Sequence, residues 1–320
     1  MTPEQCAEFA RGFSVLSQNI SQAVLGKTQA IELVLTALFS GGHVLLEDFP
    51  GTGKTSLARA LAASISGSHR RIQFTPDLLP SDVIGVTTFD QRTNNFDFHP
   101  GPVFCSVLLA DEINRASPKT QSSLLEVMEE SNVTVDGLTY PVPAPFMVIA
   151  TQNPVEQVGT YPLPEAQLDR FLIKTSIGYP EHAAEMAILR ETERRDRAAG
   201  LEPVASAEEV LAGAALAATT FVDNAILDYA LRICRATRGD SQTTLGVSVR
   251  GAMALVRCSK VWAPAHGRTY VTPDDVKALA PAVLSHRIMV ETDAEIAGVT
   301  AGQVVARILA ETVPPAERAA

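Results

Sequence analysis

The sequence has few cysteines and no spacing typical of a metal site. Its 320 residues include four cysteines that form no Cys-x-x-Cys pair, namely Cys6, Cys105, Cys234 and Cys258. Zinc sites and disulfide frameworks depend on closely spaced or paired cysteines, so neither is expected. The six histidines also lack metal-ligand spacing. We therefore expect reduced, ordinary thiols and ordinary imidazoles.

Basic residues are scarce relative to acidic ones. Lys and Arg number 26 against 36 Asp and Glu, which gives a net charge of −10. A protein that grips nucleic acid neutralises phosphates with lysine and arginine, so this balance disfavours nucleic acid as a partner. The basic clusters at 69–71 and 190–197 are local, and acidic residues interrupt the second. Both are typical of solvated faces, although the composition stays compatible with a locally basic pore.

Long apolar runs and low-complexity tracts are missing too. No segment reaches the about 18 uninterrupted apolar residues that a membrane-spanning helix needs. The first residues, Met1-Thr2-Pro3-Glu4, lack the basic start of a signal peptide, so we expect a cytoplasmic protein that does not insert into a membrane. There is no long Pro, Gly or Ser tract, and 320 residues exceed one comfortable core. Two folded domains are therefore expected.

A glycine-rich turn between an apolar run and a helical pattern is the first feature that predicts chemistry. Val44-Leu45-Leu46 predicts a buried strand that ends at Glu47, and the following glycines allow backbone amides to turn towards a polyphosphate. Lys54 would offer a cation to the β and γ phosphates, and Thr55 a hydroxyl to Mg²⁺. The helix beginning there would point its positive end at the anion. The residues predicted to bind ATP at this loop are Pro50, Gly51, Thr52, Gly53, Lys54, Thr55 and Ser56.

One position departs from the general phosphate-loop pattern. That pattern has glycine at position 48, where this chain has Asp48. The turn at 50–53 keeps its glycines, so the prediction of a phosphate loop stands. The alternative is a glycine-rich strand-to-helix turn with an incidental lysine, and the later motifs argue against it.

Two carboxylates follow a second apolar run. Val107 to Ala110 predicts a buried strand that delivers Asp111 and Glu112 to its carboxyl end, where α/β sheets place ligands. Asp111 would hold Mg²⁺ through water, and Glu112 would polarise the attacking water. A third apolar strand, from 146 to 150, leads to Asn153, which could orient that water. Alone, these would be a charged strand end and a turn residue, but in this order they predict ATP hydrolysis.

These motifs and their surroundings resemble the MoxR family of AAA+ ATPases over nearly the whole chain. The resemblance implies an α/β fold, an AAA+ P-loop three-layer core with a parallel sheet, followed by a smaller all-α lid domain. We predict that residues 1–180 form an N-terminal helix and the ATPase core and that 181–320 form the lid, with a hinge at 178–180. The matching runs are Gly41 to Asp48, Asp111 to Gln121, Ala150 to Pro154, Leu163 to Phe171, Tyr270 to Val276 and Ala280 to Leu284.

The resemblance also implies an assembly and further site residues. It implies a homo-hexameric ring that holds ATP and Mg²⁺ at each interface. Leu25 and Gly26 match positions that contact adenine. Arg170 matches an arginine inserted into the neighbouring subunit's site, and Arg250 matches the sensor-2 arginine of the lid. Arg115 is a further candidate for an interface contact.

Both principal arginines have a plainer alternative, a surface arginine in a salt bridge. The surroundings of Arg250 depart from the family pattern, because Val249 stands where relatives usually have proline. This weakens the signal for a helix start but leaves the arginine in place.

Two β-hairpins are predicted within the core. Residues 86–98 alternate apolar and polar about 93–95, and a second pair of short runs flanks Asp136-Gly137. Their positions match inserts that face the pore or a partner in relatives, and the alternative is that they only cover sheet edges. Beyond 180 only helical patterns follow, at 225–234, 251–260 and 272–279, with Thr272 as a cap and Asp275 reaching back to it.

The resemblance favours a chaperone-like role in which the ring remodels or activates client proteins, usually with a von Willebrand factor A domain partner. The Asp-x-Ser-x-Ser motif of that domain is absent here, so such a partner would be another chain. One alternative is the motor subunit of a metal chelatase, which would depend on a tetrapyrrole-binding partner. Another is a DNA-acting motor or transcription activator, but the chain lacks a Gly-Ala-Phe-Thr-Gly-Ala loop and a helix-turn-helix extension.

Overall fold

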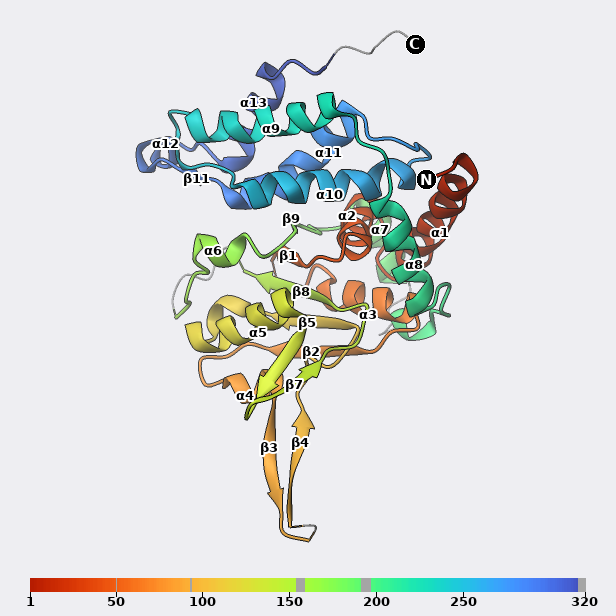
Figure 1. Cartoon of the computed structure of the whole chain (residues 1–320), viewed down its shortest axis with the longest axis vertical. Coiled ribbons are helices and arrows are strands. Elements are labelled where there is room, and N and C mark those ends of the chain that lie inside the picture. The colour runs from red at the N-terminus through yellow and green to blue at the C-terminus, as the bar shows by residue number, and fades with distance from the viewer. Residues whose placement is uncertain (50, 93, 154–158, 191–196, 316–320) are drawn as a thin grey trace. The chain divides into compact units, whose positions relative to one another are not determined.

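The computed structural model describes residues 1–49, 51–92, 94–153, 159–190 and 197–315, which fold as two compact units (Figure 1). The core unit comprises Val15–Phe171 and Thr175–Leu211. The helical unit comprises Met1–Ser14, Leu172–Lys174 and Ala212–Ala320. The predicted boundary at residue 180 stays a prediction, because these units describe compactness rather than which residues fold alone.

A five-stranded sheet forms the centre of the core unit, in the order β2-β5-β8-β1-β9. The pairs β2 with β5, β5 with β8 and β8 with β1 are parallel, so these four strands end at the same edge. The strands are β1 (Val44–Glu47), β2 (His69–Gln73), β5 (Val107–Asp111), β8 (Met147–Gln152) and β9 (Ile173–Thr175).

Both faces of this sheet are buried, as expected for parallel strands. On one face, Leu108 and Val148 join a cluster with Leu124 and Met128 of α5 (Pro118–Glu130). Their neighbours in the strands point the other way, and Leu109 is also fully buried. On that side the sheet lies against α3 (Lys54–Ser64), which contacts β2 and β5. The three-layer α/β core predicted from the sequence is confirmed.

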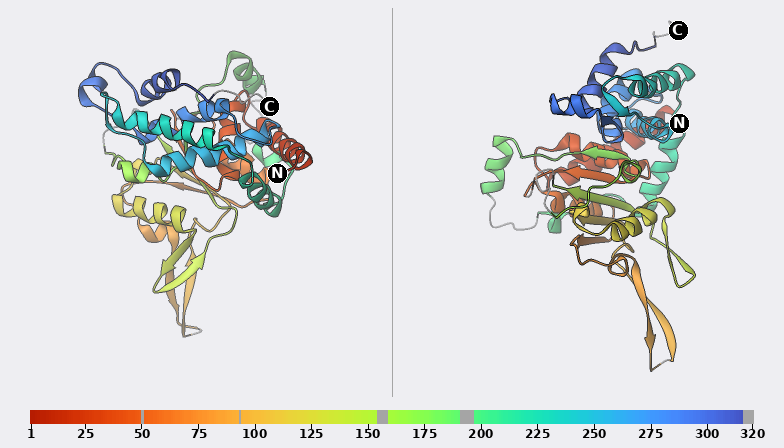
Figure 2. Two further views of the ribbon diagram at one scale, coloured as in Figure 1. Left: turned by 45° about the horizontal axis from the view of Figure 1, so that its top comes forward. Right: turned by 90° about the vertical axis from the view of Figure 1, so that its left-hand side faces the viewer.

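Both predicted hairpins are present. β3 (Gly85–Asp90) pairs antiparallel with β4 (Asn95–Pro100), and β6 (Asn132–Val135) with β7 (Leu138–Pro141). Figures 1 and 2 show that β3 and β4 extend away from the sheet of their own unit. Thr93, one of the predicted turn residues, lies outside the described residues.

The remaining elements of the core unit are short or flank the sheet. They are α2 (Thr28–Phe39), α4 (Pro80–Ile84), η1 (Ile113–Arg115), α6 (Glu165–Leu168), α7 (His182–Arg190) and η2 (Ala198–Gly200). Two helices contribute to both units, α1 (Pro3–Ser21) and α8 (Ala207–Ala218).

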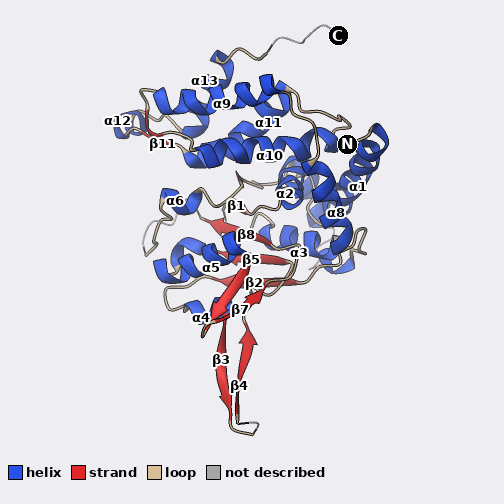
Figure 3. Ribbon diagram, in the orientation of Figure 1, coloured by secondary structure: helices blue, strands red, loops and turns tan. Residues whose placement is uncertain are grey.

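Beyond α8 the described chain is mainly helical (Figure 3). The three predicted helices are confirmed, and α11 has the predicted capping box between Thr272 and Asp275. A short antiparallel pair, β10 with β11, was not predicted. The elements are α9 (Asn224–Gly239), β10 (Thr243–Leu245), α10 (Val249–Ala265), α11 (Pro273–Leu284), η3 (Ser285–Arg287), β11 (Met289–Val290), α12 (Thr292–Ile296) and α13 (Ala301–Glu311).

Burial changes the acidity of the cysteine thiols. All four are free and buried. Loss of solvent raises the pKa of the Cys105 thiol to about 12 and that of Cys234 to about 11. Across the part of the chain that the structure describes, no helix has the length and apolarity to cross a bilayer.

Candidate nucleotide site

The predicted phosphate loop joins the end of β1 to the start of α3. Gly51 and Gly53 have φ angles of +83° and +92°, a left-handed conformation that L side chains rarely adopt. A Cβ added at either glycine would meet nothing within 4 Å, so conformation rather than space requires glycine here. Open space beside the backbone is what a phosphate cradle needs. Pro50 lies outside the described residues.

Lys54 is the first residue of α3, and its side chain turns back over the loop. Its Nζ donates to the backbone oxygens of Asp48 at 3.1 Å and Phe49 at 3.0 Å. Thr55 and Ser56 occupy the first turn of α3 and are partly exposed. The helix start therefore presents a mobile cation, two hydroxyls and its positive dipole end to one place.

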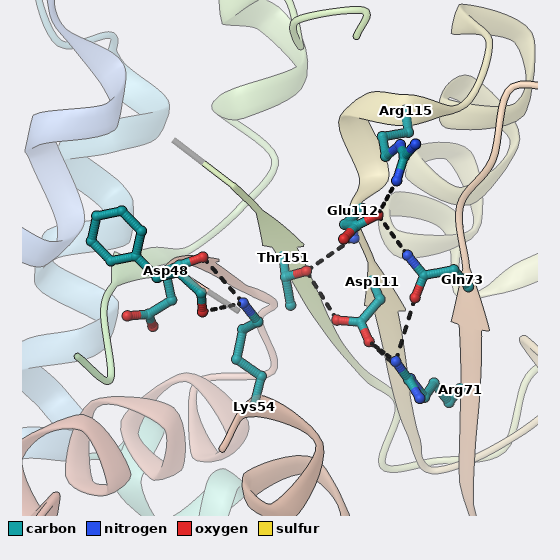
Figure 4. A network of polar contacts seen from close by, with 9 residues as sticks. Asp48, Lys54, Arg71, Gln73, Asp111, Glu112, Arg115 and Thr151 are labelled. Atoms are coloured by element: carbon teal, nitrogen blue, oxygen red, sulfur yellow. Dashed lines mark hydrogen bonds and ion pairs between the residues drawn. The ribbon is translucent and has the colours of Figure 1, made fainter. Parts of the chain in front are cut away.

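Asp111 ends β5 and is 6% exposed. Its Oδ1 accepts a hydrogen bond from Thr151 Oγ1 at 3.0 Å. Its Oδ2 accepts from Arg71 Nε at 2.8 Å, and Arg71 Nη2 lies 2.7 Å from the same oxygen (Figure 4). The carboxylate is held by side chains of the two flanking strands, β2 and β8.

Glu112 follows in a left-handed conformation, with φ 55° and ψ 50°. Its backbone N–H donates to Thr151 Oγ1 at 2.9 Å. Its Oε2 accepts from Gln73 Nε2 at 2.7 Å and from Arg115 Nη1 at 2.9 Å. Figure 4 shows how these side chains from β2, β5, β8 and η1 converge at one edge of the sheet.

The residues present fit a magnesium–nucleotide complex. Among the described residues there is no group of three or more His, Cys, Asp or Glu side chains that could hold a metal by themselves. Mg²⁺ usually keeps several waters and binds one or two carboxylates together with substrate phosphates. A single enclosed carboxylate, Asp111, with a hydroxyl at Thr55, suits that mode of binding.

The structure also describes three other predicted residues. Asn153 comes directly after β8, whose Gln152 is paired with Glu47 of β1. Leu25 and Gly26 form the turn between α1 and α2. Gly26 has φ +70°, and a Cβ there would lie 3.2 Å from Ala184 Cβ of α7.

The predicted interface arginines have different surroundings. Arg170 Nη1 donates to the Leu125 backbone oxygen at 2.8 Å, and Nη2 lies 3.2 Å from Glu129 Oε2. Both partners belong to α5 of the same chain. The guanidinium borders a surface pocket of about 310 Å³ whose lining also includes Glu126 and Glu130. Arg115 is also ion-paired within its own chain, with Glu112.

Arg250 lies in the first turn of α10, in the helical unit, and is exposed. The helix begins at Val249 although proline is absent there. Ser248 is the N-cap, and its hydroxyl accepts from Gly251 N at 3.2 Å. A serine cap thus supplies the start signal.

Comparison with known proteins agrees with this geometry. Residues 43–173 match the AAA family, described as ATPases associated with various cellular activities, and residues 235–308 match the AAA lid domain. Chaperone MoxR1 of Mycobacterium tuberculosis is 40% identical over 310 residues, which cover 92% of this chain and 80% of that protein. The chain belongs to the MoxR family of AAA+ ATPases.

Two further proteins are similar to this MoxR-family chain over almost its whole length. The Bacillus subtilis protein YeaC, which carries no stated function, is 47% identical over 95% of both chains. A crystal structure from Cytophaga hutchinsonii, described as a candidate ATPase, superposes with a TM-score of 0.90 at 37% identity, covering 97% of this chain and 96% of that one. The fold and the family resemblance predicted from the sequence are confirmed.

Sequence reasoning missed three residues of the polar network, namely Arg71, Gln73 and Thr151. Arg71 and Gln73 are two apart on β2, so they share one face of the strand, and Gln73 is in register with Asp111. The polar alternation at 71–73 was visible in the sequence. Its meaning depended on knowing that β2 is the neighbour of β5.

Proposed function

We propose that this MoxR-family protein hydrolyses ATP with Mg²⁺ and uses the cycle to remodel or activate client proteins. We further propose that it works as a homo-hexameric ring in the cytoplasm, with a separate von Willebrand factor A domain protein as partner. Residues 1–180 would act as the ATPase core and 181–320 as a lid.

The observation that carries the proposal is the placement of opposite charges at one sheet edge. The predicted phosphate loop and Lys54 follow β1, and Asp111 and Glu112 lie at the end of β5, with only β8 between these parallel strands. Ligands of α/β sheets bind outside the carboxyl ends of the strands. A triphosphate on the loop would therefore have its far end directed at the two carboxylates.

Each residue has a proposed task in hydrolysis. The loop amides, from Gly51 to Gly53, and Lys54 would bind the phosphates, and Leu25 and Gly26 would contact the adenine. Mg²⁺, held by Thr55 and Asp111, would neutralise charge on the phosphates when bound. Glu112 would polarise the attacking water, and Asn153 would orient it.

The arginines would complete the site between subunits. Arg170 would act on the nucleotide of a neighbouring subunit, where a guanidinium stabilises charge on the transferring phosphoryl group. Arg250 would act as the sensor-2 arginine, reaching the γ-phosphate from the lid. The ion pair between Arg170 and Glu129 is compatible with this role, because a pair whose side chains are 31% and 37% exposed can be broken at little cost in free energy.

The hairpins are the proposed contact with clients or partner. Phe89 and Phe96 are 49% and 68% exposed, and their rings lie 5.2 Å apart on the projecting β3–β4 hairpin. Exposed aromatic pairs of this kind are common anchors at protein interfaces.

Client capture with a hydrolysis-blocked variant tests the proposal. Glu112→Gln loaded with ATP and Mg²⁺ should retain specific proteins, including a von Willebrand factor A domain protein, and release them when Mg²⁺ is chelated. Lys54→Ala, which should not bind ATP, is the matched control. The proposal is wrong if the wild-type protein neither binds nor hydrolyses ATP, and its client part is wrong if both variants retain the same proteins.

A further inference from the structure

The position that departs from the phosphate-loop pattern, Asp48, has an enclosed carboxylate with an unusual set of partners. Asp48 is 3% exposed. Its Oδ2 accepts from the backbone N–H of Ile177 at 2.6 Å, and its Oδ1 accepts from that of Gly178 at 2.8 Å. One carboxylate thus binds two successive amides of the segment that follows β9. Glycine at position 48 would offer those amides no acceptor.

Two other contacts reach the same segment, residues 177–179. The ring of Phe49 stacks on that of Tyr179, with centroids 6.2 Å apart and planes 14° from parallel. Lys27 Nζ donates to the Tyr179 backbone oxygen at 2.6 Å. Lys27 follows the proposed adenine-contacting turn, and Asp48 and Phe49 open the phosphate loop. Residues 177–179 therefore contact both the proposed adenine-binding turn and the start of the phosphate loop.

We propose that Asp48 is a positioning residue that fixes the entrance of the phosphate loop to the backbone of residues 177–178. The inference rests on the proposed nucleotide binding. Hydrogen bonds to an ionised acceptor are roughly twice as strong as neutral ones, so this carboxylate is a firm anchor. The Asp48 backbone oxygen also accepts from Lys54, so movement of the anchor is passed on to the phosphate-binding cation. The loop and residues 177–179 move as one piece.

Asp48→Asn tests this with little change of shape, because the amide keeps one acceptor and turns an NH₂ donor towards the other N–H. We expect a fluorescent ADP analogue to bind at least about tenfold more weakly. Hydrogen exchange at Ile177 and Gly178 should quicken and should no longer slow when ADP is added. Asp97→Asn, which removes the same charge from the exposed face of β4, should change neither readout.

The outcomes separate this inference from the proposed function. If Asp48→Asn melts at a lower temperature but binds ADP like the wild type, Asp48 is only structural and the proposal is wrong. If wild-type protein binds no ADP, the proposed function fails, and the exchange of Ile177 and Gly178 still decides whether Asp48 joins the two segments. Should Asp48→Asn not fold, Asp48→Ser replaces it, because it keeps a single small acceptor in place of the carboxylate. Unchanged ADP affinity and exchange in Asp48→Ser would then overturn the coupling.

Discussion

At the scale of single residues, the proposed mechanism assigns one task to each side chain of the site. Glu112→Gln should leave ATP binding intact but lower turnover by ~10² or more, because an amide cannot act as a base. Lys54→Ala should lose binding instead, since it removes the cation proposed to bind the phosphates. Single-turnover hydrolysis and fluorescent-nucleotide affinity measure the two effects separately. Near wild-type turnover by Glu112→Gln would make Glu112 a structural residue.

Thr151 is a second residue with a defined task, because its hydroxyl donates to Asp111 and accepts from the Glu112 backbone. Thr151 is 1% exposed, so Thr151→Val would leave a buried carboxylate oxygen and a partly buried N–H without this partner. We expect a loss of about 1–3 kcal/mol in the free energy of unfolding, together with reduced hydrolysis. Thr151→Ser keeps the hydroxyl and should restore most of both. Urea unfolding that is equal for the valine and serine variants would contradict this.

The buried thiol of Cys105 predicts a pH dependence of stability. Its pKa is about 12 in the folded chain and about 8.5 when unfolded, so folding favours the neutral thiol. That stabilisation is complete below pH ~8.5 and is lost as the pH rises towards 12, by roughly 1.4 kcal/mol per unit. Urea unfolding between pH 8 and pH 10 should show a shallower decline for Cys105→Ala than for the wild type. Parallel declines would show that the thiol does not contribute.

At the scale of elements, the β3–β4 hairpin is expected to serve recognition rather than hydrolysis. Phe89→Thr with Phe96→Thr keeps strand propensity while removing both exposed rings. Basal ATPase should stay unchanged, because these rings lie outside the polar network, whereas stimulation by a client or partner should fall. Phe98→Ala is the contrasting variant: its ring stacks on Tyr140 at 4.1 Å, so it should destabilise the junction of the two hairpins. Loss of basal ATPase in the double variant would assign the hairpin a structural role.

The sequence predicted elements well where a local signal existed. The loop glycines, the two hairpin turns and the Thr272 cap each carry a conformational demand that neighbouring residues reveal. The β10–β11 pair escaped prediction, because strands of three and two residues show no periodicity. The hydrogen-bond partners of Asp111 could not be predicted from the sequence for another reason. Arg71 reaches it from 40 residues away, through a register that only the folded sheet defines.

At the scale of the whole molecule, Arg170 should act across a subunit boundary. Arg170→Ala alone and Glu112→Gln alone should both be nearly inactive. In a mixed ring, an Arg170→Ala subunit keeps its own Glu112 and can use Arg170 of a Glu112→Gln neighbour, so steady-state ATPase should partly return. An arginine in trans is worth ~10³ or more in rate, whereas a surface ion pair contributes under ~1 kcal/mol to stability.

A control variant separates these two roles of Arg170. Glu129→Gln removes the ion-pair partner and leaves the guanidinium, so it should retain activity. If Glu129→Gln is as inactive as Arg170→Ala, the intrachain pair is what matters. No recovery in mixed rings, with subunit exchange confirmed, would place Arg170 in its own site or make hydrolysis depend on an unbroken ring.

The strand order has a consequence for how the chain folds during synthesis on the ribosome. β1 is made early, but its sheet neighbours are β8 and β9, and Val44 pairs with Ile149. A nascent chain that ends before β8 offers β1 no neighbouring strand. The phosphate loop then follows an unpaired strand and has no fixed position. Loop closure over such a separation is entropically costly and slow. Nucleotide affinity should therefore appear late and abruptly during synthesis, once residues beyond Gly178 have left the exit tunnel. Shorter nascent chains should depend on chaperones to protect them from aggregation.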